Sequence, residues 1–162
     1  MTDVIALCSS LPQRTFRAGE TILEDGARAG MLYILSAGTV EVLKGDFQVA
    51  SVDTPGAFFG DVSVLLDQAH MATVRAVTDA TLFVANDPLG FLHSNPEIAL
   101  SLSRLLAKRL HSVTTYLVDL KRQFEDQGSH LAMVDEVLEA LVHHQGTEST
   151  PGSDRCPDPT VE

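Results

Sequence analysis

Cysteine, long apolar runs and basic residues are all scarce in this 162-residue chain. The two cysteines, Cys8 and Cys156, lie near opposite ends and have no CxxC partner, so the sequence predicts neither a disulfide framework nor a thiolate metal site. The apolar runs span a few residues, far below the roughly 20 needed to cross a bilayer, and the N-terminus lacks the pattern of a signal peptide. We therefore expect a cytoplasmic protein with no membrane partner.

The low basic content also bears on nucleic acids. Eleven Lys and Arg residues oppose 22 Asp and Glu residues, giving a formal net charge of −11. A surface this negative repels phosphate backbones unless a basic face is segregated, and the basic residues from Arg104 to Arg122 share a helical stretch with acidic ones. We expect no nucleic-acid partner, and residues 129–162 are too few and too acidic for a helix-turn-helix domain.

Common catalytic signatures are missing as well. The sequence has no GxSxG, GxxxxGK, HExxH or GxGxxG motif. Of the six histidines only His70 falls in the strand-rich half, which excludes the HxH metal set of cupin enzymes. The sequence therefore predicts neither an enzyme nor a metal site.

What the first half does contain is short strand-like runs separated by glycines. Such a pattern indicates an all-β sandwich, roll or barrel, because glycine supplies the positive φ that tight turns require. Two hairpin-sized connections, 36–38 and 44–46, predict antiparallel neighbours. The expected strands are Thr21–Leu23, Met31–Leu35, Thr39–Leu43, Phe47–Val52, Thr73–Val77 and Thr81–Val84.

Two helices are expected to follow, one starting at Asp87–Pro88 and one at Asn95–Pro96, since proline is favoured in a first helical turn. In the second helix apolar residues alternate in steps of four and three, which is a heptad pattern typical of a coiled coil. This heptad seam comprises Leu106, Leu110, Val113, Leu117, Leu120 and Phe124, and predicts a homodimer.

The same phase continues beyond Gly128, which favours one helix to about His143, because a few buried leucine pairs offset the roughly 1 kcal/mol cost of an interior glycine. The alternative is a break at Gly128 followed by a short helix that folds back. The expected organisation is a sensor domain in 1–95, a long helix in 96–144 and a disordered acidic tail in 145–162.

The strand-rich half resembles the cyclic-nucleotide-binding domain family over about Leu11 to Leu120. The resemblance is carried by FRAGETILEDGARAGMLYILSAGTVEV, PGAFFGDVSVLLDQAHMATVRAVTDATLFV and NPEIALSLSRLLAKRL. It implies an eight-stranded antiparallel β-roll, of double-stranded β-helix or jelly-roll type, with a ligand pocket. It also implies the arrangement of Crp/Fnr-type sensors, in which a long C-terminal helix pairs two subunits.

The family's phosphate-binding cassette corresponds here to residues 59–66 and the loop 67–73. In members that bind cAMP or cGMP, a short helix presents backbone N–H groups to the cyclic phosphate, a glutamate accepts from the ribose and an arginine pairs with the phosphate. The residues at the corresponding ligand-binding positions are Phe59, Gly60, Asp61, Val62, His70, Met71, Ala72, Thr114 and Thr115.

The cassette departs from the family pattern at four positions. Asp61 replaces glutamate, Ala69 replaces proline, His70 replaces arginine, and Met71 replaces a small or hydroxyl residue. A guanidinium is a permanent bidentate phosphate ligand, whereas an imidazole gives one hydrogen bond and is charged only below a pKa near 6.5. Loss of one charge-assisted contact weakens binding roughly tenfold to a hundredfold. Arg75 cannot replace it, because five residues along a strand its side chain points to the opposite face.

The roles of several of these residues have two possible interpretations. Asp61 either contacts ribose or caps the short helix after Gly60. His70 is either a pH-dependent phosphate ligand or, as we favour, a solvent-exposed loop histidine. Thr114 and Thr115 either touch a nucleotide base, as the resemblance implies, or form a surface pair, which is slightly favoured.

Two functions follow from the sequence. The first is a non-enzymatic ligand-sensing regulatory module in which occupancy is coupled to the long helix. The second is a degenerate roll that binds no nucleotide and serves as a dimerisation or protein-docking unit. The four cassette substitutions favour the second, whereas the glycine framework is compatible with both.

Overall fold

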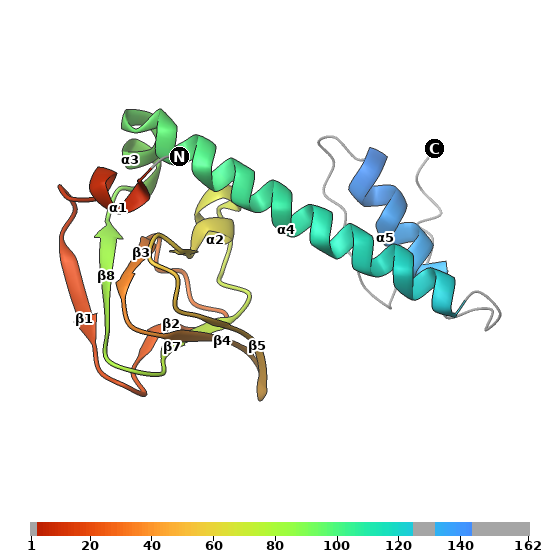
Figure 1. Ribbon diagram of the computed structural model, residues 1–162, viewed down its shortest axis with the longest axis horizontal. Coiled ribbons are helices and arrows are strands. Elements are labelled where there is room, and N and C mark those ends of the chain that lie inside the picture. The colour runs from red at the N-terminus through yellow and green to blue at the C-terminus, as the bar shows by residue number, and fades with distance from the viewer. Residues whose placement is uncertain (1–2, 125–131, 144–162) are drawn as a thin grey trace. The chain divides into compact units, whose positions relative to one another are not determined.

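The computed structural model describes residues 3–124 and 132–143 (Figure 1). The chain divides into two compact units, residues 1–103 and 104–162. In chain order the elements are α1 (Val4–Leu7), β1 (Gln13–Phe16), β2 (Thr21–Leu23), β3 (Leu32–Ala37), β4 (Val40–Lys44), β5 (Phe47–Val52), β6 (Phe58–Phe59), α2 (Asp61–Leu66), β7 (Thr73–Ala76), β8 (Ala80–Ala85), α3 (Pro88–Ser94), α4 (Pro96–Gln123) and α5 (Ala132–His143).

The strands of the first unit form two four-stranded antiparallel sheets. Their orders are β1-β8-β3-β6 and β2-β7-β4-β5. Consecutive strands thus alternate between the sheets at several points along the chain, as expected for a roll. The predicted antiparallel β-roll is confirmed.

All six expected strands are present, and Thr21–Leu23 and Phe47–Val52 have the predicted bounds. The hairpin at residues 44–46 joins β4 to its antiparallel neighbour β5. The predicted hairpin at residues 36–38 is wrong: β3 pairs with β6 and β8, whereas β4 pairs with β5 and β7. The chain turns a corner there at Gly38, where an added Cβ would clash with the carbonyl oxygen of Asp79, so that only glycine fits.

The hydrophobic core lies between the two sheets, because both contribute alternate apolar residues to one buried cluster. β3 is buried on both faces: Tyr33 and Leu35 join this cluster, whereas Leu32 and Ile34 point the other way and are also fully buried. The helices α1, α3 and the start of α4 gather at one end of the roll (Figure 1). They contribute buried apolar side chains of their own, among them Leu92, Ile98 and Leu102.

Both predicted helix starts are confirmed. The Asp87 side chain accepts a hydrogen bond from the Gly90 backbone at 3.2 Å, and Pro88 opens α3. α4 begins with Pro96, and the Asn95 carbonyl accepts from the Ala99 N–H at 3.1 Å. The first part of α4 belongs to the roll unit, which ends at Ser103.

In the second unit the expected single helix is replaced by two. α4 ends at Gln123, Phe124 lies in a turn, and α5 begins at Ala132. An ion pair joins Lys121 to Asp135, which a continuous helix would hold about 21 Å apart, so the chain reverses between them. Gly128, the proposed break, and the tail lie outside the described residues.

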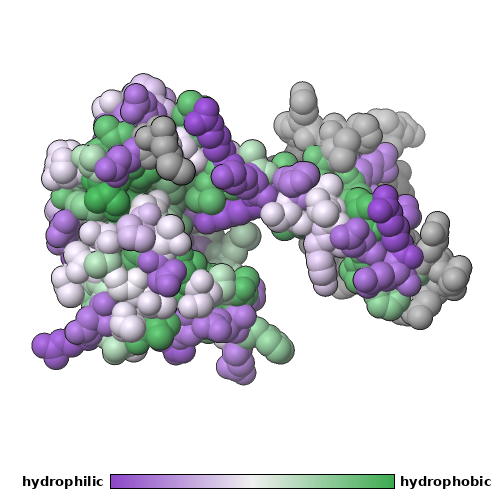
Figure 2. All heavy atoms as spheres, viewed as in Figure 1, coloured by the Kyte–Doolittle hydropathy of each residue, from purple (hydrophilic) through white to green (hydrophobic). Residues whose placement is uncertain are grey.

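Within the described part of the chain, no helix combines the length and apolar character of a membrane span. On the face of the roll shown in Figure 2, apolar patches alternate with hydrophilic ones.

Candidate functional site

The cassette is built on a sharp turn at Gly60, between β6 and α2. Gly60 has φ of 83°, and an added Cβ would lie 2.7 Å from the Met31 carbonyl oxygen. Both the left-handed backbone and this close approach require glycine. The turn therefore fixes where α2 starts, in agreement with the cassette expected from the sequence.

Asp61 is the first residue of α2 and is only 5% exposed. It does not cap the helix, since the capping position is Gly60, which has no side chain to accept a hydrogen bond. The capping interpretation is therefore wrong, and the reason is that the turn needs glycine at the position where a capping aspartate would stand. Asp61 remains at the position that the family resemblance assigns to the ribose carboxylate.

His70 is buried, with 6% of its surface exposed, so the favoured interpretation as an exposed loop histidine is wrong. The loop is drawn inward by two backbone hydrogen bonds to the segment after β2. The Gly26 N–H donates to the His70 carbonyl at 2.8 Å, and the His70 N–H donates to the Ala27 carbonyl at 3.0 Å. This long-range pairing is what buries the side chain.

The His70 imidazole contacts α2 through Ser63. Its Nδ1 lies 2.8 Å from Ser63 Oγ, and Ser63 Oγ lies 3.1 Å from the Gly60 carbonyl oxygen. Burial lowers the pKa of His70 below its usual value of 6.5, because the apolar surroundings disfavour the imidazolium. At neutral pH the ring is therefore neutral.

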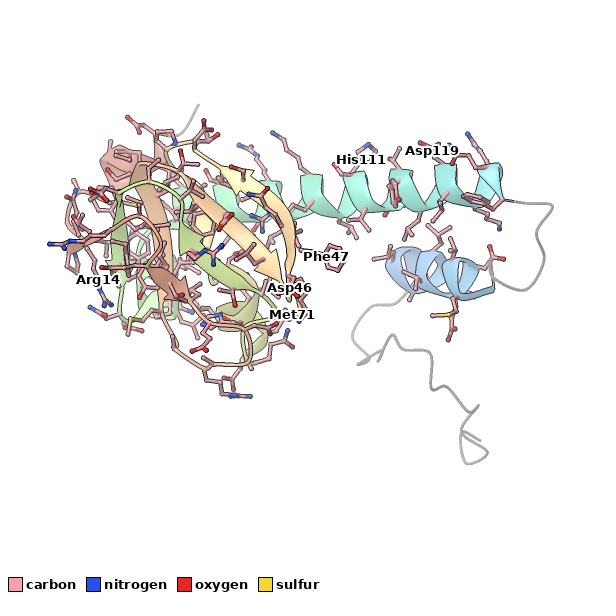
Figure 3. All side chains as sticks on the ribbon, turned by 90° about the horizontal axis from the view of Figure 1, so that it is seen from below. Arg14, Asp46, Phe47, Met71, His111 and Asp119 are labelled. Atoms are coloured by element: carbon pink, nitrogen blue, oxygen red, sulfur yellow. The ribbon has the colours of Figure 1, made fainter. Side chains whose placement is uncertain are left out.

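The other cassette residues divide between core and surface. Phe59 is buried, and Val62 and Ala72 are half-buried. Met71 is 57% exposed and lies at the same edge of the roll as Asp46 and Phe47 of the β4–β5 hairpin (Figure 3). An exposed thioether has no N–H or O–H group with which to donate a hydrogen bond to a phosphate.

Arg75 is engaged elsewhere, as its position in the strand predicted. Its Nε donates to Glu41 Oε1 at 2.8 Å, across the neighbouring strands β7 and β4. This pairing uses the guanidinium away from the cassette.

Thr114 and Thr115 belong to the second unit. Thr114 donates to the Leu110 carbonyl at 2.8 Å, and Thr115 is exposed. No three potential metal-ligating side chains gather within residues 3–124 and 132–143.

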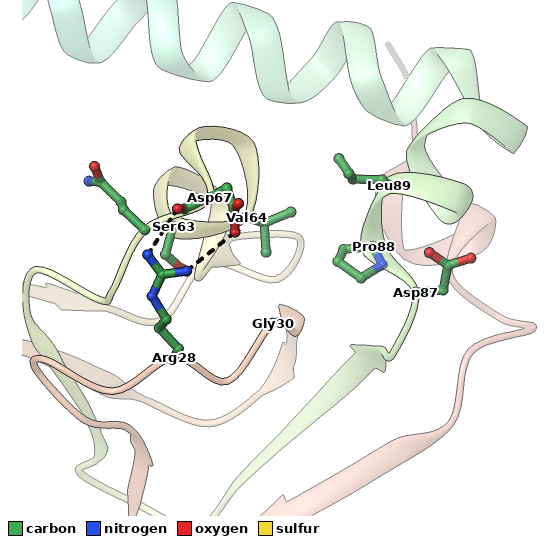
Figure 4. Close-up of a pocket in the computed structure, with 9 residues that line it drawn as sticks. Arg28, Gly30, Ser63, Val64, Asp67, Asp87, Pro88 and Leu89 are labelled. Carbon is green, nitrogen blue, oxygen red and sulfur yellow. Dashed lines mark hydrogen bonds and ion pairs between the residues drawn. The ribbon is translucent and has the colours of Figure 1, made fainter. Parts of the chain in front are cut away.

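A cleft of about 250 Å³ opens beside the cassette, between α2 and the start of α3 (Figure 4). On the α2 side, Arg28 reaches the end of the helix, donating to the Asp67 carbonyl at 3.2 Å and lying 3.5 Å from its carboxylate. Pro88 and Leu89 form the opposite wall. Ser63 lines this cleft as well as contacting His70.

Sequence reasoning missed both Ser63 and Arg28 as site residues. Ser63 lies in the cassette segment 59–66 but not at one of its expected ligand-binding positions, and Arg28 lies outside the cassette. The roles of both residues depend on pairings between distant segments. The three-residue spacing from Gly60 to Ser63, one helical turn, is the one signal that could have suggested that Ser63 faces the cassette turn.

Comparisons with known proteins agree with this geometry. Residues 13–87 match the family model of the cyclic nucleotide-binding domain. A CRP-like cAMP-activated global transcriptional regulator of Mycobacterium tuberculosis is 26% identical over 123 residues, covering 72% of this chain and 55% of the relative. An uncharacterized ABC transporter ATP-binding protein of the same organism is 33% identical over 69 residues, covering 40% of this chain. The chain spans about a fifth of the length of that relative (21%).

Solved structures show the same fold. The catabolite activator protein of Thermus thermophilus superposes with a TM-score of 0.64 at 23% identity, covering 86% of this chain and 80% of that one. A protein from a study of a cyclic-GMP-dependent signalling pathway in bacterial phytopathogenesis has a TM-score of 0.59 at 24% identity, covering 69% and 95%. Residues 13–87, which hold the β-roll, the glycine turn and the cassette helix, are thus a domain of the cyclic nucleotide-binding type, and the chain is similar in structure to CRP-family sensor domains.

Proposed function

We propose that this protein is a non-enzymatic regulatory module that binds a small ligand at the cassette and forms a homodimer through α4. The observation that carries the proposal is the preserved frame of the cassette. Gly60 keeps the left-handed turn, α2 follows it directly, and the loop at His70 is fixed to the Gly26–Ala27 segment by two backbone bonds. A frame held this firmly can position a ligand even though individual side chains have changed.

The helix α4 could couple ligand binding at the cassette to dimerisation. Its first part is packed into the roll through Ile98 and Leu102, whereas its later part carries the heptad seam. Val113 of the seam is 50% exposed and Leu110 is 45% exposed in the single chain. A second copy that covers these residues would remove apolar surface from water, and a shift in roll packing would act on the same helix.

The second candidate is a dimerisation or docking unit that binds no nucleotide. The burial of His70 favours it, because the residue at the family's arginine position is neutral and turned toward Ser63. The exposed Met71 favours it as well. On this alternative the roll serves as a scaffold, and the heptad seam of α4 is the surface that binds a second copy or another protein.

Calorimetric titration separates the two. The cAMP-activated relative makes cAMP the first probe, followed by cGMP and a cyclic dinucleotide. Sedimentation with and without each probe then reports whether occupancy changes the dimerisation constant. We expect heat of binding together with a change in dimerisation for at least one probe. Absence of heat and of a thermal shift with every probe, at both acidic and neutral pH, would leave the docking unit as the function.

A further inference from the structure

The hydrogen bonds around His70 fix where its proton lies. The Ser63 hydroxyl has one proton to donate, and the Gly60 carbonyl oxygen, 3.1 Å away, can only accept. Both contacts of Ser63 are therefore satisfied together only when the hydroxyl donates to Gly60 and accepts from the His70 Nδ1–H, at 2.8 Å. In the neutral ring this leaves Nε2 with a lone pair.

That lone pair has no partner. Within the described residues, Nε2 of His70 is a fully buried side-chain atom without a hydrogen bond, in a residue that is 94% buried. Buried polar atoms without a partner are rare and costly, so they call for a physical explanation. When the ring gains a proton, the Gly60–Ser63–Nδ1 chain remains intact and the new N–H at Nε2 is the one donor left over.

We propose that His70 Nε2 is a proton-gated contact for an anionic ligand, so that the cassette takes up a phosphate-ester anion only together with a proton. This inference rests on the proposed ligand-binding function and adds pH as a second input to it. His70 is then the residue that decides between binding and exclusion. The neutral ring presents a lone pair, which repels an anion, whereas the protonated ring presents a charge-assisted donor.

Charged groups on the neighbouring segments of the chain affect the protonation equilibrium of His70. Arg28 is engaged with Asp67 at the end of α2, and Asp25 with Lys44 at 2.9 Å, so neither pair carries net charge. Burial of the ring disfavours its protonated form, whereas a bound anion would favour it. The ionisable groups on these elements are Glu24, Asp25, Arg28, Asp61 and Asp67.

Linkage gives the expected size of the effect. Because the ring of the free protein is neutral above its lowered pKa, binding there must take up about one proton per ligand. The dissociation constant then rises up to about tenfold for every unit of pH above that pKa. A nucleotide held through the permanent charge of an arginine would show no such slope in this range.

The test is calorimetry of the full chain with cAMP, cGMP and a cyclic dinucleotide at about pH 5.5, 6.5 and 7.5. Each titration is repeated in two buffers that differ in ionisation enthalpy, which measures proton uptake directly without any substitution. Inorganic phosphate serves as a further probe and distinguishes recognition of a nucleotide from recognition of a free oxyanion.

Three variants accompany the wild type. His70→Gln removes the titration and is expected to lose low-pH binding. His70→Arg supplies a permanent charge and is expected to bind without pH dependence. His93→Gln, at an exposed histidine of α3, is the matched control and is expected to behave as wild type. Thermal unfolding verifies that each variant folds. If His70→Arg does not fold, the proton-uptake measurement on the wild-type protein still tests the proposal.

The outcomes separate this inference from the proposed function. Binding without proton uptake, or with an unchanged slope in His70→Gln, overturns the proton gate and leaves the ligand sensor standing. Absence of wild-type binding at every pH also overturns the gate. If a folded His70→Arg variant then binds one of the probes, the backbone of the cassette is able to hold a ligand. If this variant also binds none of them, the ligand-sensor proposal fails as well.

Discussion

At the scale of single residues, Gly60 is the position on which the cassette depends. Its positive φ and the 2.7 Å approach of the Met31 carbonyl oxygen to an added Cβ both oppose any other residue. We expect Gly60→Ala to lower the free energy of unfolding by more than the roughly 1–2 kcal/mol that left-handed backbone alone costs an L-residue. Urea unfolding measures the change.

Gly45 is a matched control for this substitution. It also has positive φ, 59°, but an added Cβ would meet no atom within 4 Å. Gly45→Ala should therefore show the backbone cost alone. Equal losses in the two variants would mean that the contact with Met31 does not constrain the turn.

His70 carries a second residue-scale prediction, which concerns stability in the absence of ligand. Burial lowers the pKa of His70 in the folded protein below 6.5, so the unfolded chain binds the proton more readily. The contribution of neutral His70 to stability is thus fully present above about pH 6.5 and is lost as the pH falls through the folded pKa. Chemical denaturation between about pH 5 and pH 8 should show this loss in wild type and a smaller one in His70→Gln. An identical pH profile in the two proteins would contradict it.

At the scale of elements, the sequence predicted strands where apolar residues alternate and missed those that lack this pattern. β1 buries only Phe16 of its four residues, and β6 is two residues long. Neither strand therefore shows the alternation of apolar and polar residues by which a strand is recognised in a sequence. The corner at Gly38 looks like a hairpin locally, and only the pairing of β3 and β4 with different partners shows otherwise. The burial of His70 could not be predicted from the sequence either, because it depends on backbone hydrogen bonds to residues more than 40 positions away.

The heptad seam of α4 yields the dimer prediction. Val113 is half exposed in the single chain, so Val113→Asp should not disturb folding, yet it would place a carboxylate inside the proposed interface. We expect the variant to be monomeric by light scattering at concentrations where wild type is dimeric. Ser112→Asp, at the neighbouring exposed position outside the seam, is the control and should remain dimeric. A dimeric Val113→Asp protein would refute the seam as the interface.

The reversal between α4 and α5 can be tested through its ion pair. A zero-length carbodiimide cross-link should join Lys121 to Asp135 within one chain, since their charged groups are in contact. A continuous helix would separate the two positions by about 21 Å and would not allow this link. Peptide mass spectrometry of the monomer band identifies the product, and Asp135→Asn should abolish it. A wild-type band lacking the link would argue against the reversal.

At the scale of the whole molecule, the boundary of the roll unit differs from the one expected from the sequence. A boundary at residue 95 follows the change from strands to helices, whereas the compact unit continues to Ser103. The reason is that Ile98 and Leu102, at the start of α4, are almost completely buried. The first part of α4 therefore belongs to the core of the roll unit, and its later part carries the proposed dimer interface.

This shared helix leads to the prediction for truncated chains. Burial of a large aliphatic side chain contributes about 1.5–3 kcal/mol, so removing both Ile98 and Leu102 should cost roughly 3–6 kcal/mol. That is a large part of the 5–15 kcal/mol by which a typical domain is stable. Residues 1–103 should unfold cooperatively as a monomer, whereas residues 1–95 should be strongly destabilised. Thermal and urea unfolding compare the two, with Ile98→Ala in the longer fragment as an intermediate. If residues 1–95 proved as stable as residues 1–103, then α4 would not be anchored in the roll, and the proposed route from cassette to dimer would lose its physical basis.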